Sequence, residues 1–196
     1  MNVKSFLLKH KSTLVMILAL FTFRWSFADH YRVPTGSMLP TIQFGDHVFT
    51  NKMAYDFKIP FTEISLAHTG EPKRGDVMVF LFPKDESVNF VKRVIGLPGE
   101  TLKIENNKIY INGTELDETY LPEAARHIIY EHQFEVNIPQ DMYFVMGDNR
   151  ENSLDSRYWG LVPRKNVKGK ASGVLWNISF NEIIPSVNLT RIGARL

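Results

Sequence analysis

Two hydrophobic patterns divide the chain near residue 30. Residues 13–23 (TLVMILALFTF) form an uncharged apolar run, whereas the rest of the chain carries short apolar stretches separated by Pro, Gly and Asn. Short stretches rich in β-branched and aromatic side chains are typical of strands, and a longer apolar run is typical of a helix. The pattern predicts one N-terminal helix and a body that is mainly β.

The body is predicted to be one unit built around an antiparallel β-sheet. Asn106 and Asn112 begin turn dipeptides, which predicts a hairpin over residues 101–116. Residues from about 99 to 141 are more polar and are expected to form a small β-hairpin side lobe, with at most a short helix within 121–132. Strands are expected over residues 46–55, 76–82, 88–96, 101–116, 132–139, 142–147 and 171–179.

The N-terminal apolar segment admits three interpretations. Lysines at positions 4, 9 and 11 precede it, which favours an N-terminus inside and a body outside. A membrane anchor would divide the chain into a cytoplasmic tail (1–11), a short transmembrane segment (12–29) and an extracytoplasmic domain (30–196). The sequence Ser-Phe-Ala before Asp29 equally describes a cleavable secretory signal, and a buried core helix is the third alternative.

Composition excludes several classes of function. A net charge of +2 with scattered Lys and Arg offers no basic surface for nucleic acid. The lack of cysteine excludes disulfides, thiolate catalysis and zinc–thiolate sites. The six histidines show no metal-ligand spacing, so that no metal and no other cofactor is expected. The candidate nucleophiles are therefore hydroxyl groups.

The loop of residues 33–41 (VPTGSMLPT) contains the candidate nucleophile, Ser37. A serine hydroxyl is a weak nucleophile until a base accepts its proton. A lysine can be that base where burial lowers its pKa from about 10.4 towards neutrality. The loop alone does not say which residue this base would be.

Lys92 is the candidate base, because it lies within an apolar stretch (SVNFVKRVIG). In a strand, alternation places Lys92 on one face with Val88, Phe90 and Val94, and Arg93 on the other. A lysine in such a row is either buried or extends its amine to solvent, and edge strands often carry a solvated lysine. Both interpretations remain open on this stretch alone.

A third polar region, residues 145–163, follows the predicted strand 142–147 directly. A polar surface loop with Asx turns is one interpretation. A buried hydrogen-bonding network that orients a catalytic group is the other, because loops at strand ends commonly carry functional sites. The spacing of Asp155 and Arg157 predicts an ion pair within it.

These segments together, and in their order, resemble bacterial type I signal peptidase, a family of membrane-anchored Ser-Lys proteases that remove signal peptides. The resemblance covers nearly the whole chain. It rests on an N-terminal anchor followed by the motifs PTGSMLPT, GDHVFTNKMAY, RGDVMVF, VKRVIGLPGE and GDNRENSLDSRYWGLVP.

The resemblance implies a catalytic role for each matching residue. Ser37 would be the nucleophile and Lys92 the general base. Thr35 and the Ser37 backbone N–H would bind the oxyanion. The supporting residues would be Ser153, which orients the Lys92 amine, Asp155, which braces the site through Arg157, and Gly147, which lets the chain pass close to Lys92.

The resemblance also implies a substrate site for an extended peptide with small residues before the cut bond. A shallow apolar pocket selects such residues by excluding larger ones. The peptide would bind as an added strand beside the segments that bear Ser37 and Lys92. The positions that match the lining of this site are Tyr31, Val33, Met38, Ile42, Phe90 and Val91.

The family further implies where the protein acts and with what. It favours an uncleaved single-pass anchor in the bacterial inner membrane, with the catalytic domain on the periplasmic or outer face. The partners would be signal-peptide-bearing preproteins and the lipid bilayer, and the protein is expected to be a monomer without nucleic acid or cofactor. Several family members have two spanning segments, whereas this sequence shows one clear candidate, and self-cleavage before Asp29 is a further possibility.

Two other functions compete with a general signal peptidase. A dedicated maturation protease for a pilin or another single exported protein would use the same catalytic motifs. An anchored β-rich binding module would require Lys92 to be an ordinary solvated lysine.

Overall fold

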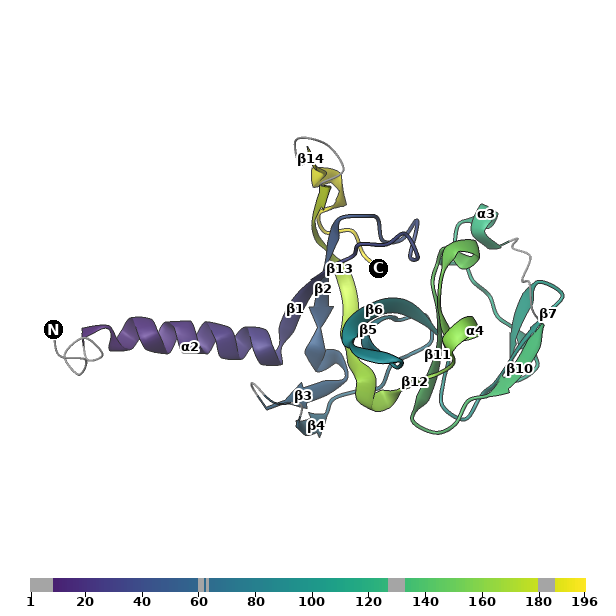
Figure 1. Cartoon of the computed structure of the whole chain (residues 1–196), viewed down its shortest axis with the longest axis horizontal. Helices are drawn as coiled ribbons and strands as arrows, with labels where there is room; N and C mark the ends of the chain where they lie inside the picture. Colours follow the sequence, from purple (N-terminus) through teal and green to yellow (C-terminus); the bar gives the residue numbers. More distant parts are fainter. Residues whose placement is uncertain (1–8, 60–61, 63, 127–132, 180–185) are drawn as a thin grey trace.

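The computed structural model describes residues 9–59, 62, 64–126, 133–179 and 186–196. Its strands pair in antiparallel sheets, which confirms the prediction of a mainly β protein. Figure 1 shows α2 (Lys11–Ser26) projecting from one end of a β-rich body, with the side lobe at the opposite end. The catalytic candidates lie in the body between them.

The main sheet is eight-stranded and runs in the order β1-β2-β13-β5-β6-β11-β12, with β14 paired to β13. Its register brings distant segments together: β6 lies between β5 and β11, so that Lys92 pairs with Met78 and Val94 with Val145. The strands are β1 (Ala28–Arg32), β2 (Asp46–Asn51), β5 (Val77–Phe82), β6 (Asp85–Gly96), β11 (Met142–Met146), β12 (Val162–Pro163), β13 (Val167–Ser179) and β14 (Ser186–Val187).

The side lobe contains a four-stranded sheet in the order β10-β7-β8-β9. The predicted hairpin is present, and Asn106 and Asn107 both adopt positive φ angles, 51° and 62°, as a two-residue turn of this kind requires. The strands are β7 (Thr101–Glu105), β8 (Lys108–Ile111), β9 (Thr114–Glu115) and β10 (Phe134–Asn137), and the short helix expected nearby is α3 (Glu123–Arg126). Residues 127–132 of that expectation lie outside the described residues.

The side lobe and the main sheet share a hydrophobic core. Ile95 and Phe144 of the main sheet pack in one buried cluster with Leu102, Ile104 and Ile109 of the lobe. Burying aliphatic side chains stabilises a fold by about 1.5–3 kcal/mol each. The lobe is therefore held against the sheet that carries Lys92.

Several elements differ from the expected ones. The strand expected over 46–55 ends at Asn51 and continues as the short 3-10 helix η1 (Lys52–Ala54). A separate two-stranded sheet, β3 (Asp56–Lys58) with β4 (Ser65–His68), was not expected. Its strands are only three and four residues long, too short for a clear alternating pattern.

The N-terminal helix is shorter than the expected spanning segment. It ends at Ser26, and β1 begins at Ala28, before the expected domain boundary at residue 30. Within the described ranges, no helix combines the length and the apolar character needed to cross a membrane. The spanning segment over residues 12–29 therefore stays a prediction.

Candidate functional site

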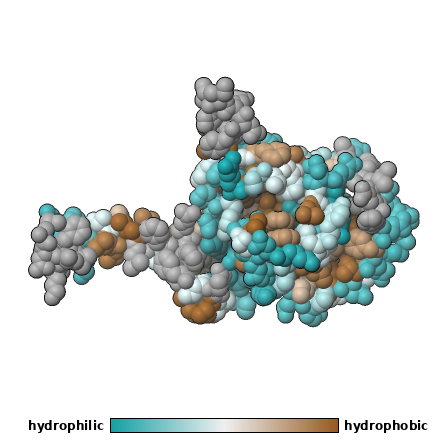
Figure 2. All heavy atoms as spheres, viewed as in Figure 1, coloured by the Kyte–Doolittle hydropathy of each residue, from teal (hydrophilic) through white to brown (hydrophobic). Residues whose placement is uncertain are grey.

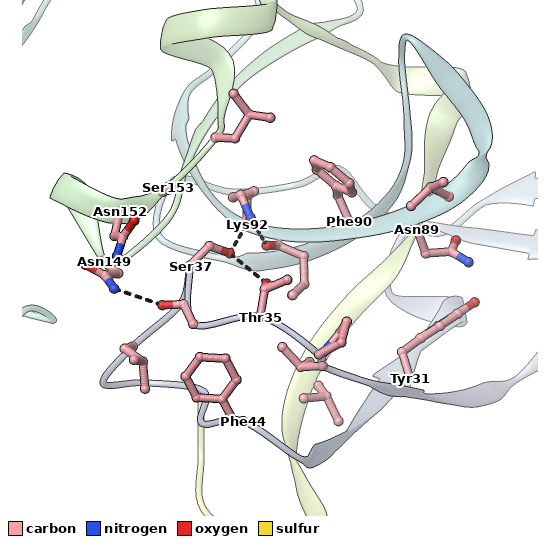
Figure 3. Close-up of a pocket in the computed structure, with 18 of the residues that line it drawn as sticks. Tyr31, Thr35, Ser37, Phe44, Asn89, Phe90, Lys92, Asn149, Asn152 and Ser153 are labelled. Atoms are coloured by element: carbon pink, nitrogen blue, oxygen red, sulfur yellow. Dashed lines mark hydrogen bonds between the residues drawn. The ribbon is translucent and has the colours of Figure 1, made fainter. Parts of the chain in front are cut away.

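A cavity of about 1070 Å³ opens on the body between the segment that follows β1, the strand β6 and the loop that follows β11. Figure 3 shows its centre, where Ser37, Thr35 and Lys92 point towards one another. The cavity is lined by residues 31–37, 87–92 and 151–154, with Asn149 and Tyr158 among others. The three regions that the sequence singled out thus meet in one place.

Ser37 and Lys92 are in direct contact although they are 55 positions apart. Lys92 Nζ lies 2.7 Å from Ser37 Oγ and 3.0 Å from the carbonyl oxygen of Val91, to which it donates. Only 4% of Lys92 is exposed, and its strand is flanked on both sides by others. The alternative of a solvated lysine on an edge strand is therefore wrong.

Burial lowers the pKa of Lys92, so that part of its amine is neutral near pH 7. The loss of solvation lowers the pKa of Lys92 to about 8, against the opposing effect of the carboxylates of Asp155 and Asp148. The Phe90 ring, with its centroid 5.3 Å from Nζ, belongs to these apolar surroundings. At pH 7 about one such amine in ten is neutral, compared with about one in 2,500 for an ordinary lysine. A neutral amine can accept the Ser37 hydroxyl proton.

Thr35 stands beside the nucleophile. Its Oγ1 lies 3.5 Å from Ser37 Oγ, and the side chain faces the open cavity (Figure 3). A hydroxyl at this position can donate to an oxygen that becomes negative when Ser37 attacks a carbonyl. A role of Thr35 in an oxyanion hole stays a prediction.

Asn149 fixes the loop that carries Ser37, a role that the sequence did not indicate. Its side-chain amide donates to the carbonyl oxygen of Gly36 at 3.0 Å, and its backbone N–H donates to the carbonyl oxygen of Ser37 at 3.1 Å. Two hydrogen bonds from one residue thus hold the peptide units on both sides of Ser37. The sequence feature that could have indicated this role is the position of Asn149 within the polar segment that follows β11.

Gly147 permits a close approach to Ser37 and Ser153. A Cβ atom on Gly147 would lie 2.2 Å from Ser153 Oγ and 2.3 Å from the carbonyl oxygen of Ser37. Both distances are far below normal contact. The glycine therefore lets the chain pass against the backbone of Ser37 and against Ser153, and the expected approach to Lys92 stays a prediction.

Asp155 and Arg157 form the predicted ion pair. Arg157 Nε and Nη2 donate to the two carboxylate oxygens of Asp155, both at 2.8 Å. Asp155 is fully buried and also accepts the Gly147 N–H at 3.0 Å. It precedes α4 (Ser156–Trp159) and caps that helix through the Arg157 N–H. The pair thus connects α4 to the backbone that passes Ser37.

Ser153 lies at the cavity but does not make the expected contact. It is buried, and its Oγ has no hydrogen-bond partner in the described part of the protein. The Lys92 amine instead contacts Ser37 and Val91. An orienting role of Ser153 towards Lys92 stays a prediction.

The six expected substrate positions divide into two groups. Tyr31, Val33, Phe90 and Val91 line the cavity. Met38 and Ile42 do not, because both are fully buried, in a core cluster that they share with Val33. These two residues support the lining from beneath, and the expectation that they form it is corrected.

A buried ion pair behind the site was also missed. Arg93 donates from Nε and Nη2 to the two oxygens of Asp148, at 2.8 and 2.6 Å, and Thr41 Oγ1 donates to the same carboxylate at 2.6 Å. Only 4% of Arg93 is exposed and Asp148 is fully buried. An arginine placed among valines in a predicted strand needs a buried partner, and this was the signal available.

Over the residues that the structure describes, no group of three or more His, Asp or Glu side chains could hold a metal ion. The chemistry that the arrangement supports is nucleophilic attack by a serine with a lysine as its base.

Comparison with known proteins identifies the family. The family model described as "Signal peptidase, peptidase S26" matches residues 7–176. A signal peptidase I of Pseudomonas aeruginosa is 33% identical over 93% of this chain and 77% of its own, and one of Leptolyngbya laminosa is 35% identical over 85% and 76%. A crystal structure of a signal peptidase I from Enterococcus faecalis is 37% identical over 53% of this chain and 98% of its own, with a TM-score of 0.47. The chain belongs to the signal peptidase family, peptidase S26.

Proposed function

We propose that this protein removes signal peptides from preproteins as a signal peptidase I, with Ser37 as nucleophile and Lys92 as general base. The relatives named signal peptidase I support the activity over most of the chain. The observation that carries the catalytic assignment is the 2.7 Å contact between Ser37 Oγ and an almost completely buried Lys92 amine.

The reaction follows from the positions of these groups. The neutral Lys92 amine accepts the proton of Ser37, and Oγ attacks the carbonyl carbon of the bond to be cut. The negative oxygen that forms is stabilised by the Thr35 hydroxyl and the Ser37 N–H. Lys92 then gives its proton to the leaving amine, and it later deprotonates the water that hydrolyses the acyl-enzyme.

The cavity lining selects for small residues before the cleaved bond. Tyr31, Val33, Phe90 and Val91 form an apolar wall beside Ser37. Such a wall excludes large side chains by shape, because apolar contact alone distinguishes similar residues weakly. The preprotein binds as an extended strand along this wall.

We also propose that the N-terminal segment attaches the protein to the bacterial inner membrane in a single pass, with the body on the periplasmic or outer face. Large apolar side chains on α2 are 42–62% exposed at four consecutive positions, 14–17, and at Leu20. Figure 2 shows this apolar surface on the projecting helix. A helix that is apolar on every side needs apolar surroundings.

Incubation of the full-length protein with a preprotein tests the catalytic assignment. Wild-type protein is expected to release the mature chain, while Ser37→Ala and Lys92→Met release none and remain folded. Near wild-type turnover by either purified variant would contradict the assignment of Ser37 and Lys92 as the catalytic pair. A panel of different preproteins distinguishes a general enzyme, which cleaves many, from a protease dedicated to one exported protein.

A further inference from the structure

Three residues join the side lobe to the loop of residues 147–155, which follows β11 and lies beside Ser37. Glu118 and Tyr120 lie in the lobe between β9 and α3, and Arg150 begins the 3-10 helix η2 (Arg150–Asn152) after β11. We call Glu118, Tyr120 and Arg150 the lobe clamp. Its members come from segments about 30 positions apart, and no chemistry of the Ser37 site uses them directly.

The clamp is fully hydrogen-bonded around a buried charge. The Arg150 side chain is 0% exposed, and its Nη1 donates to Glu118 Oε2 at 2.8 Å. Its Nη2 donates to the Tyr120 hydroxyl at 3.2 Å, and that hydroxyl donates to Glu118 Oε1 at 2.7 Å. A buried arginine without a carboxylate partner is strongly unfavourable. The position of Arg150 therefore depends on Glu118.

Arg150 also fixes the backbone of the loop after β11 at two points. Its Nε donates to the carbonyl oxygen of Gly147 at 3.0 Å, and its own carbonyl oxygen accepts from Arg157 Nη2 at 2.7 Å. Gly147 lies against the Ser37 backbone, and Arg157 holds Asp155. A displacement of Arg150 would therefore disturb both Gly147, which packs against Ser37, and Arg157, which pairs with Asp155.

Tyr120 provides a second connection to the site. The guanidinium carbon of Arg93 lies 4.4 Å from the centroid of the Tyr120 ring, a distance at which a cation is attracted to the ring face. Arg93 follows Lys92 in β6 and holds Asp148. Tyr120 of the lobe thus contacts both Arg150 and Arg93.

We propose that Glu118 and Tyr120 are positioning residues for catalysis: the side lobe aligns Ser37 with Lys92 by holding Arg150 against the Gly147–Asn149 backbone. This inference rests on the proposed function above. A misplacement of about 1 Å between reacting groups lowers a rate by about a hundredfold. A loosened loop also admits water to Lys92, and solvation returns its pKa towards the ordinary range.

Glu118→Gln tests the proposal against the matched control Glu115→Gln. Glu115 lies in the same lobe and pairs with Lys108 at 2.8 Å, but both side chains are about half exposed, 51% and 52%. For Glu118→Gln we expect kcat for a short signal-peptide substrate to fall about tenfold with KM within about twofold. The pH at which kcat is half-maximal is expected to rise. Glu115→Gln is expected to match the wild type in both respects.

Two further variants separate positioning from stability. Tyr120→Phe removes only the hydroxyl, leaves the ring over Arg93 and is expected to lower kcat about threefold with the fold intact. Glu118→Asp keeps the charge and is expected to recover part of the loss. Wild-type kcat and an unchanged pH profile in Glu118→Gln would overturn the proposal, and so would a loss of kcat that the unfolded fraction fully explains.

Hydrogen exchange provides a readout that does not depend on cleavage. Glu118→Gln is expected to speed amide exchange at residues 147–149 but not in β2, and unchanged exchange at 147–149 would overturn the clamp. If the wild-type protein cleaves no preprotein, the proposed function fails. The exchange result still decides whether the clamp holds the loop.

Discussion

Arg157 donates to both carboxylate oxygens of Asp155, each at 2.8 Å, and so partly neutralises the negative charge of Asp155. Asp155 is the larger of the two carboxylate influences that raise the pKa of Lys92. The loss of solvation outweighs both carboxylates, and the pKa of Lys92 is lowered to about 8. Pairing with Arg157 weakens the attraction of Asp155 for a charged Lys92, and so favours the neutral amine that could accept a proton from Ser37.

Cleavage should depend on pH through Lys92. The lowered pKa of about 8 means that kcat/KM rises about tenfold per pH unit below pH 8 and levels off above it, because only the neutral amine accepts the serine proton. A pH–rate profile with a soluble peptide between pH 5.5 and 10 measures this. Constant activity from pH 6 to 9 would contradict the assignment of Lys92 as base.

Arg157→Met should move this profile to higher pH. Without its partner, the Asp155 carboxylate stabilises the charged form of Lys92 and raises its pKa. We expect lower activity at pH 7.5 and recovery near pH 9, while Arg157→Lys, which keeps the charge, shifts less. A profile of Arg157→Met that coincides with the wild type would show that Asp155 does not act on Lys92.

Lys92→Met should make the protein more stable at neutral pH. The folded state disfavours the charged amine, since the pKa of Lys92 falls from 10.5 to about 8. The unfolded chain therefore binds more protons between these values, and the wild type gains stability as pH rises through this window. Its free energy of unfolding should approach that of Lys92→Met by about 3 kcal/mol between pH 7.5 and 10.5. Denaturant titrations at both pH values test this, and a pH-independent difference would contradict it.

Thr35→Val should remove the second donor of the oxyanion hole. Valine keeps the shape of threonine but lacks the hydroxyl that lies 3.5 Å from Ser37 Oγ. We expect kcat to fall about a hundredfold with little change in KM. Thr35→Ser retains the hydroxyl and should stay within about tenfold of the wild type. Equal rates for the valine and serine variants would remove Thr35 from the mechanism.

Gly147→Ala should inactivate the enzyme through the backbone of Ser37. The new Cβ atom would lie 2.3 Å from the Ser37 carbonyl oxygen, so that the nucleophile must move. Gly113→Ala is the control, because Gly113 has a positive φ of 81° but a Cβ atom on it would meet no heavy atom within 4 Å. The control should lower Tm slightly at unchanged kcat, whereas wild-type kcat in Gly147→Ala would contradict the close packing.

The fold was largely predictable because its strands carry strong local patterns. Residues 76–82, 88–96 and 142–147 are short apolar stretches bounded by turn residues, and each forms a strand near its expected bounds. The neighbours of each strand were not predictable in this way. Lys92 is buried because β5 and β11 flank its strand, and alternation along one strand cannot distinguish a central position from an edge.

The site was predictable where the family resemblance reached, and less so beyond it. Ser37, Lys92, Thr35 and the Asp155–Arg157 pair meet as expected. Met38 and Ile42 were also assigned to the lining from the resemblance, but their side chains turn into the core. The link from Glu118 to Arg150 spans 32 positions and leaves no local pattern that a single sequence reveals.

A single residue, Phe27, separates the end of α2 at Ser26 from the start of β1 at Ala28. β1 is paired with β2 from its first residue, Ala28 opposite Asn51, and its continuation leads directly to Ser37. Figure 1 shows α2 running into β1 without an intervening loop. With a connection of one residue, the direction of α2 relative to the cavity can change only through the backbone around Phe27, so that whatever holds α2 also constrains the direction in which the cavity faces.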